Sequence, residues 1–139
     1  MKPPVLVLDT NILLDIFVFN DERTKTLKAA LIEKSIQAFA SQKTFEEFAD
    51  VISRPLFSLK TDAQEQILGE WKALATQIDD STLSTAPWLC RDPDDQIFLD
   101  LAYALKPCTL ISKDREILKI ASRARKEEVR ITQDYNAFR

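Results

Sequence analysis

The chain has 139 residues, of which 45% are hydrophobic and 29% charged, and its formal net charge is −3. This composition is that of an ordinary globular protein and argues against a strongly basic protein that coats nucleic acid. The first apolar run is interrupted by Asp9 and Asp15, and Lys2 stands alone without a small-residue cleavage site behind it. We therefore expect no membrane span, no secretory signal, one domain over residues 1–139 and a cytoplasmic location.

Two absences limit the chemistry that the chain can perform. It has no histidine, which removes the commonest general base and the usual zinc ligand. Its single glycine, Gly69, cannot build a glycine-rich phosphate loop, and Cys90 and Cys108 lack the paired spacing of a disulfide framework or a zinc site. Any catalysis must therefore rely on carboxylates, hydroxyls, amides and lysine, a set that points to hard metal ions.

Short apolar runs predict strands, and amphipathic segments bounded by capping residues or prolines predict helices. In chain order the elements are a strand over 5–8, a helix over 12–17, a helix from 21 or 24 to 34, a strand over 35–40, a helix from 44 to 53, a helix from 61 or 62 to 78, a loop over 79–93, a helix over 94–105, a strand over 109–112, a helix over 115–126 and a strand over 129–131. This alternation predicts a three-layer α/β/α sandwich with a central, mostly parallel sheet.

Several residues define these boundaries. Asp9, Thr10 or Asn11 can cap the first helix, and Thr44 with Glu47 fits a capping box for the third. In the fourth helix, Ala75 and Ile78 share the apolar face, and in the fifth Asp100 points outward.

Acidic side chains follow the predicted strands at the points where the strands end. Asp9 ends the first strand, Glu47 lies in the first turns of the helix after the second, and Asp114 follows the strand over 109–112. Further acids crowd the start of the helix over 94–105, namely Asp92, Asp94 and Asp95. Because parallel strands present their carboxyl ends at one edge of a sheet, these acids are expected to meet there.

Four carboxylates held close together require a counter-charge, because like charges raise one another's pKa. Mg²⁺ or Mn²⁺ meets this need, since both are hard cations that take oxygen ligands. Such an ion can activate water and neutralise phosphate charge, so the site suits phosphodiester hydrolysis without histidine. Each acid also has a structural interpretation: Asp9 and Asp114 can be helix caps, Glu47 half of a capping box, and the acids of 92–95 favourable charges at a helix N-terminus.

Four segments of the chain resemble, in order and spacing, the acidic motifs of PIN-domain ribonucleases. They are "VLVLDTNILLD", "SQKTFEEFADVISRPLF", "RDPDDQIFLDLAYA" and "TLISKDREIL". The resemblance extends over residues 5–131 and is greatest to the compact bacterial PIN proteins that act as toxins of toxin–antitoxin pairs. It implies a Mg²⁺- or Mn²⁺-dependent endoribonuclease, an antitoxin protein as partner and a homodimer.

The resemblance also assigns residues to the site. The four family acids, catalytic and metal-binding, match Asp9, Glu47, Asp95 and Asp114. Glu47 matches better than Glu46 because it leads directly into "EFADVISRPLF". Asn11 matches the family's amide, Ser112 its hydroxyl, and Asp92 is a supporting acid.

A basic segment follows the last of these acids. Residues 106–130 contain eight Lys and Arg against four Asp and Glu, although a solvated helix face explains such a run equally well. The candidates for contact with RNA phosphates are Lys113, Arg115, Arg123 and Arg125.

Two other functions stay open at this point. An aspartyl-phosphate phosphatase also places an acid after its first strand, but it usually needs a second aspartate where this chain has Asn11. The other is a non-catalytic acidic α/β module that binds RNA or a protein partner.

Overall fold

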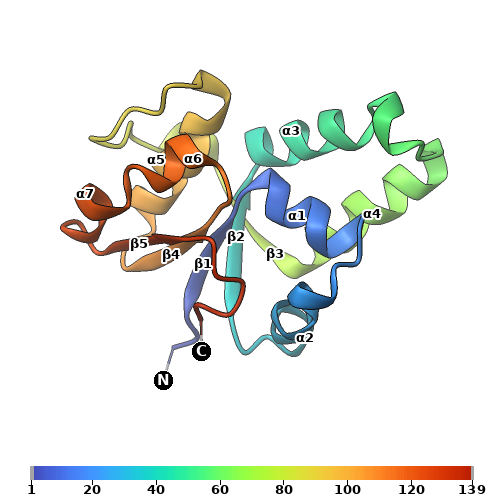
Figure 1. Ribbon diagram of the computed structural model, residues 1–139, viewed down its shortest axis with the longest axis horizontal. Helices are drawn as coiled ribbons and strands as arrows, with labels where there is room; N and C mark the ends of the chain where they lie inside the picture. Colours follow the sequence, from blue (N-terminus) through green and yellow to red (C-terminus); the bar gives the residue numbers. More distant parts are fainter. Residues whose placement is uncertain (1, 139) are drawn as a thin grey trace.

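The computed structural model describes residues 2–138, which form a five-stranded, all-parallel sheet in the order β3-β2-β1-β4-β5 (Figure 1). The strands are β1 (Val5–Leu8), β2 (Gln37–Ser41), β3 (Ala75–Ile78), β4 (Cys108–Ile111) and β5 (Val129–Thr132). The helices are α1 (Thr10–Phe17), α2 (Lys25–Glu33), α3 (Gln42–Ile52), α4 (Thr61–Leu74), α5 (Gln96–Ala104), α6 (Arg115–Leu118) and α7 (Ala121–Arg125). Short 3₁₀ turns are η1 (Glu22–Thr24), η2 (Pro55–Phe57), η3 (Asp80–Thr82) and η4 (Pro93–Asp95).

The helices cover both faces of the sheet. Leu6 and Leu8 of β1 point into a core built with α1, α2, α3 and α4, whereas Val7 points into a second core built with α5, α6 and α7. This alternation is the period of a strand that is buried on both faces. The predicted three-layer α/β/α sandwich is therefore confirmed.

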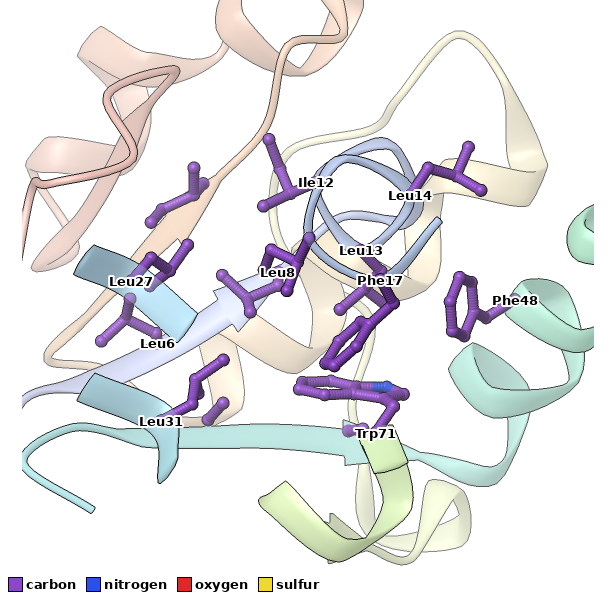
Figure 2. Close-up of a cluster of buried hydrophobic side chains, with 14 of the residues drawn as sticks. Leu6, Leu8, Ile12, Leu13, Leu14, Phe17, Leu27, Leu31, Phe48 and Trp71 are labelled. Carbon is purple, nitrogen blue, oxygen red and sulfur yellow. The ribbon is translucent and has the colours of Figure 1, made fainter. Parts of the chain in front are cut away.

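Aromatic side chains fill the core on the α1–α4 side. Figure 2 shows Trp71 of α4 against Phe17 of α1, with ring centroids 6.0 Å apart, and Phe48 of α3 nearby. Trp71 is 1% exposed, so α4 is held to the sheet although most of its surface faces solvent. The hydrophobic burial of this indole orients α4 and, through it, the strand that follows.

The prediction that the fourth helix continues to residue 78 is wrong. α4 ends at Leu74, the backbone of Ala75 is extended, and Ala75–Ile78 pairs in parallel with β2 as an edge strand. The same spacing that places Ala75 and Ile78 on a helix face is compatible with a short strand. Pairing with the otherwise open edge of β2 decides between them, and that contact is not local in the sequence.

The predicted capping box of the third helix is also wrong in its residues. α3 begins at Gln42, and its capping box is made by Ser41 and Thr44: the Ser41 N–H donates to Thr44 Oγ1 at 2.9 Å and the Thr44 N–H to Ser41 Oγ at 3.4 Å. Glu47 therefore takes no part in capping α3. Its carboxylate instead accepts a hydrogen bond from Thr10 of α1.

The segment predicted as one helix over 115–126 is two short helices, α6 and α7, with residues 119 and 120 between them. Ile117, Ile120 and Ala124 all pack into the second core. The break lets both pieces lie against the sheet, where a straight helix would carry one end away from it.

Asp100 of α5 does not point outward as expected. Its Oδ1 accepts the Ala86 N–H at 2.8 Å and a Gln96 side-chain N–H at 3.0 Å. The carboxylate thus anchors the long loop that precedes α5. Among residues 2–138, no helix is long and apolar enough to cross a membrane.

Candidate functional site

Asp9 lies at the carboxyl end of β1, at the centre of the sheet. Its N–H continues the β1–β4 ladder by donating to Ile111 O at 3.1 Å. The side chain is 3% exposed; one carboxyl oxygen accepts the Asn11 N–H at 3.4 Å and the other the Ser112 hydroxyl at 2.5 Å. The structural interpretation of Asp9 as the cap of α1 is therefore confirmed, while its second carboxyl oxygen lies with Ser112 at the carboxyl edge of the sheet.

Ser112 links Asp9 to Asp114. It follows β4 directly, its side chain is fully buried, and its Oγ accepts the Asp114 N–H at 3.0 Å while donating to Asp9. Asp114 in turn caps α6 by accepting the N–H groups of Glu116 at 2.8 Å and Ile117 at 3.2 Å. One hydroxyl thus sets the relative position of two of the predicted acids.

Glu47 reaches the same edge from α3. Its Oε2 accepts the hydroxyl of Thr10 at 3.0 Å, and Thr10 is the buried first residue of α1. From the sequence, Thr10 is expected only as a possible helix cap. Its place directly after Asp9 is the one signal in the sequence that pointed to a role beside the acids.

Asp95 is the last residue of η4 and the fourth of the predicted acids at this edge of the sheet. Partial burial and the negative charges of Asp9, Asp114, Asp92 and Glu47 raise the pKa of Asp95 to about 7. Those charges act on Asp95 because the four predicted acids lie near one another in the structure. We call Asp9, Glu47, Asp95 and Asp114 the acid cluster.

The pKa values of two other members are raised as well. Burial is the main cause at Asp9, where the hydrogen bond from Ser112 lowers the pKa and the charge of Asp114 raises it. Burial also dominates at Glu47, where the bond from Thr10 lowers the pKa and nearby carboxylates raise it. Burial, and to a smaller extent mutual repulsion, thus disfavours the charged form of these acids, and a bound cation would favour it.

The donor set fits a hard divalent cation. All four members offer carboxylate oxygens, the ligands that Mg²⁺ and Mn²⁺ prefer. Within residues 2–138, however, no three acidic or thiol side chains converge tightly enough to hold one ion by themselves. Mg²⁺ commonly binds through one or two carboxylates and keeps several waters, so the spread arrangement fits that mode.

The supporting residues predicted from the sequence differ in whether they contact the acid cluster. Asn11 is exposed in the first turn of α1, where its backbone rather than its side chain contacts Asp9. Asp92 caps η4 by accepting the Asp94 N–H at 3.0 Å. Lys113 forms an ion pair at 2.5 Å with Asp15, so in this conformation its ammonium group is already engaged.

The arginine candidates separate into two groups. Arg115 is exposed on α6, directly after Asp114, and Arg123 is exposed on α7. Arg125 instead lines a cavity of about 430 Å³ with Val5 and Val129, the first residues of β1 and β5. That cavity is at the opposite edge of the sheet, so the structure does not bring Arg125 to the acid cluster.

A cleft of about 500 Å³ opens beside Glu47, between α3 and the η4–α5 segment. Its basic lining residues are Lys43 and Arg54, and its acidic lining includes Glu47 and Asp94. No sequence pattern predicts this cleft, because it depends on how α3 and α5 pack across the sheet. Of the acid cluster, Glu47 lines it.

We expect Ser112→Ala to lower the free energy of unfolding by about 1–3 kcal/mol, because a buried carboxylate loses its donor and the Asp114 N–H its acceptor. Urea denaturation at pH 7 measures this change. Ser122→Ala, on the exposed face of α7, is the matched control and should stay within about 0.5 kcal/mol of the parent. Equal stabilities of the two variants would contradict the bridging role of Ser112.

Fold and site together define an α/β protein with an acidic cluster at the carboxyl edge of a parallel sheet. A family model for the PIN domain matches residues 5–116, the part of the chain that carries the acid cluster, and the chain belongs to the PIN-domain family. PIN domains are generally nucleases that use divalent metals such as Mg²⁺ or Mn²⁺. A search of curated proteins finds no match.

Proposed function

We propose that the protein is a metal-dependent endoribonuclease that hydrolyses RNA phosphodiester bonds with the acid cluster. The observation that carries this proposal is the polar edge of the sheet, where Ser112 joins Asp9 to Asp114 and Thr10, the residue after Asp9, contacts Glu47. Burial and the neighbouring carboxylates raise the pKa of Asp95 at the same edge. Such an arrangement is costly to the fold unless a cation binds there, and perturbed carboxylates in a cleft are typical of functional sites.

In this proposal Asp9 and Asp95 would hold Mg²⁺ or Mn²⁺ directly, and Glu47 and Asp114 would complete the site, partly through water. When bound, the ion supplies Lewis-acid polarisation of the phosphate and a water of lowered pKa. The chain's own contribution is positioning. Ser112 fixes the orientation of the Asp9 carboxylate, Thr10 holds Glu47, and the N–H groups of Glu116 and Ile117 hold Asp114.

The cleft beside Glu47 is the proposed path of the RNA strand. Lys43 and Arg54 line it, and Arg115 is exposed directly after Asp114 in the sequence, so these cationic side chains are available to RNA phosphates. Arg54 also pairs with Asp50 at 3.2 Å, which leaves Lys43 and Arg115 as the stronger candidates for phosphate contact.

Incubation of the purified protein with mixed single-stranded RNA tests the function. We expect cleavage in the presence of Mn²⁺ or Mg²⁺ and none in excess EDTA. RNA binding without cleavage, unaffected by Mn²⁺, would contradict the proposal and favour the non-catalytic binding module.

The proposal extends to a cytoplasmic toxin of a toxin–antitoxin pair that acts as a homodimer. Its support is the motif resemblance, together with an apolar surface formed by Phe19, 58% exposed, and Leu56, 84% exposed. Phe19 also contacts Phe57, with ring centroids 6.0 Å apart, so the end of α1 and η2 form one patch suited to a partner peptide.

Expression in a bacterial host tests the toxin role. We expect growth arrest with the parent protein and none with Asp9→Asn, and co-expression of a small protein encoded beside the gene should restore growth. An active nuclease that leaves growth unchanged would contradict the toxin role, and a monomer in analytical ultracentrifugation would contradict the dimer.

A further inference from the structure

A second polar cluster lies next to the acid cluster and includes a buried acid that the proposed chemistry does not use. Asp15 of α1 is 5% exposed, and its Oδ2 pairs with Lys113 Nζ at 2.5 Å and accepts the Tyr135 hydroxyl at 2.6 Å. A buried carboxylate is costly without such partners. Here the hydroxyl partner is 120 residues away in the sequence, so three distant segments meet at one oxygen.

Lys113 is the middle residue of the loop that carries two members of the site. Ser112, before it, binds Asp9, and Asp114, after it, donates its N–H to Ser112. An ion pair that fixes the Lys113 side chain therefore restrains the backbone on both sides. The Asp15 end of this pair is buried, so solvent screens it less than an ordinary surface pair.

Tyr135 belongs to the segment after β5, which runs back across the sheet from its edge (Figure 1). Tyr135 and Phe138 pack into the core on the α1–α4 side, and the Arg23 guanidinium lies 5.5 Å from the Tyr135 ring centroid. The match to the PIN-domain family ends at residue 116, so Tyr135 lies outside the matched residues.

Both partners of Asp15 keep their protons near neutral pH. Partial burial lowers the pKa of Lys113, but the hydrogen bond and charge of Asp15 outweigh this and raise it. Burial and donation to Asp15 raise the pKa of Tyr135.

We infer that Asp15, Lys113 and Tyr135 are positioning residues that hold the loop over 112–114, and with it the Asp114 carboxylate, in the geometry of the acid cluster. The consequence for activity rests on the proposed nuclease function; the restraint on the loop does not. The inference gives Lys113 a role different from RNA contact. A misplacement of about 1 Å in such a site can cost about 100-fold in rate, which makes a brace of this kind consequential.

Hydrogen exchange on the metal-free protein without RNA tests the restraint by itself. We expect Tyr135→Phe and Lys113→Met to speed exchange of the Asp114, Glu116 and Ile117 amides at least about fivefold, because their hydrogen bonds depend on the loop. Amides of α5 should be unchanged, and Tyr103→Phe, which removes a hydroxyl elsewhere, should change none of these. Unchanged exchange at the loop, or faster exchange throughout the protein, would overturn the inference.

Steady-state cleavage tests the consequence for the site. We expect Lys113→Met to lower kcat about tenfold with little change in KM, and Lys113→Arg, which can keep the ion pair, to retain most of kcat. A raised KM with unchanged kcat would instead identify Lys113 as an RNA contact and overturn the inference, as would faster loop exchange with unchanged kcat. If the parent protein cleaves no RNA, the proposed function fails, while the exchange data still decide whether the brace exists.

Discussion

Asp9→Asn is expected to reduce Mn²⁺-dependent RNA cleavage by about a thousandfold or more, because it removes the charge of a proposed direct metal ligand. The fold should survive, since an amide of the same shape can accept the Asn11 N–H through its oxygen and donate its NH₂ to Ser112 Oγ. Burial raises the pKa of Asp9, so the folded protein disfavours its charge, and the metal-free variant should melt no lower than the parent at pH 8. Cleavage assays and thermal melts measure the two effects.

The matched control for this substitution is Asp62→Asn. Asp62 is exposed in the first turn of α4, so the same change of charge is made away from the acid cluster. Cleavage by this variant should equal that of the parent. Full activity in Asp9→Asn would remove Asp9 from the proposed machinery.

The second large effect that we expect is a dependence of the free energy of unfolding on pH, caused by Asp95. Its pKa is raised from 3.8 to about 7, so the folded protein holds this proton more tightly than the unfolded chain. The stability that the folded protein gains from protonated Asp95 is fully present below pH 3.8 and is lost as the pH rises to about 7. With a discount for solvent screening, we expect the metal-free protein to lose about 1–2 kcal/mol over that range, and Asp95→Asn to abolish most of this slope.

Metal binding should reverse this trend, because an ion competes with the proton for the same carboxylate. At limiting Mn²⁺, the cleavage rate is expected to rise about tenfold per pH unit below pH 7 and to level off above pH 7. The Mn²⁺-induced rise in melting temperature should follow the same dependence on pH. A flat profile between pH 5.5 and 8, in both activity and stabilisation, would contradict the assignment of Asp95.

The sequence was sufficient to predict the fold class because the decisive signals are local. The run before Asp9 is short and fully apolar, and the strand before Ser112 is apolar except for Thr109, as suits buried parallel strands. The edge strand Ala75–Ile78 was missed because its four residues satisfy a helical period as well as an extended one. Only pairing with β2, a contact across the sheet, distinguishes them.

The acid cluster was predictable in its members but not in its hydrogen bonds. Positions after strand ends indicate which acids approach one another, whereas the Asp9–Ser112 bond joins residues 103 positions apart and the Thr10–Glu47 bond residues 37 apart. The ion pair of Asp15 with Lys113 is of the same kind. No periodicity or capping rule reports such contacts, since they depend on how separate elements pack.

The central claim, that the four acids form one metal site, is tested most directly by calorimetric titration of Mn²⁺ into the metal-free protein at pH 8. We expect saturable binding by the parent and by Asp62→Asn, and a large loss of affinity in both Asp9→Asn and Asp95→Asn. Failure of the parent to bind Mn²⁺, or equal binding by all four proteins, would contradict the claim.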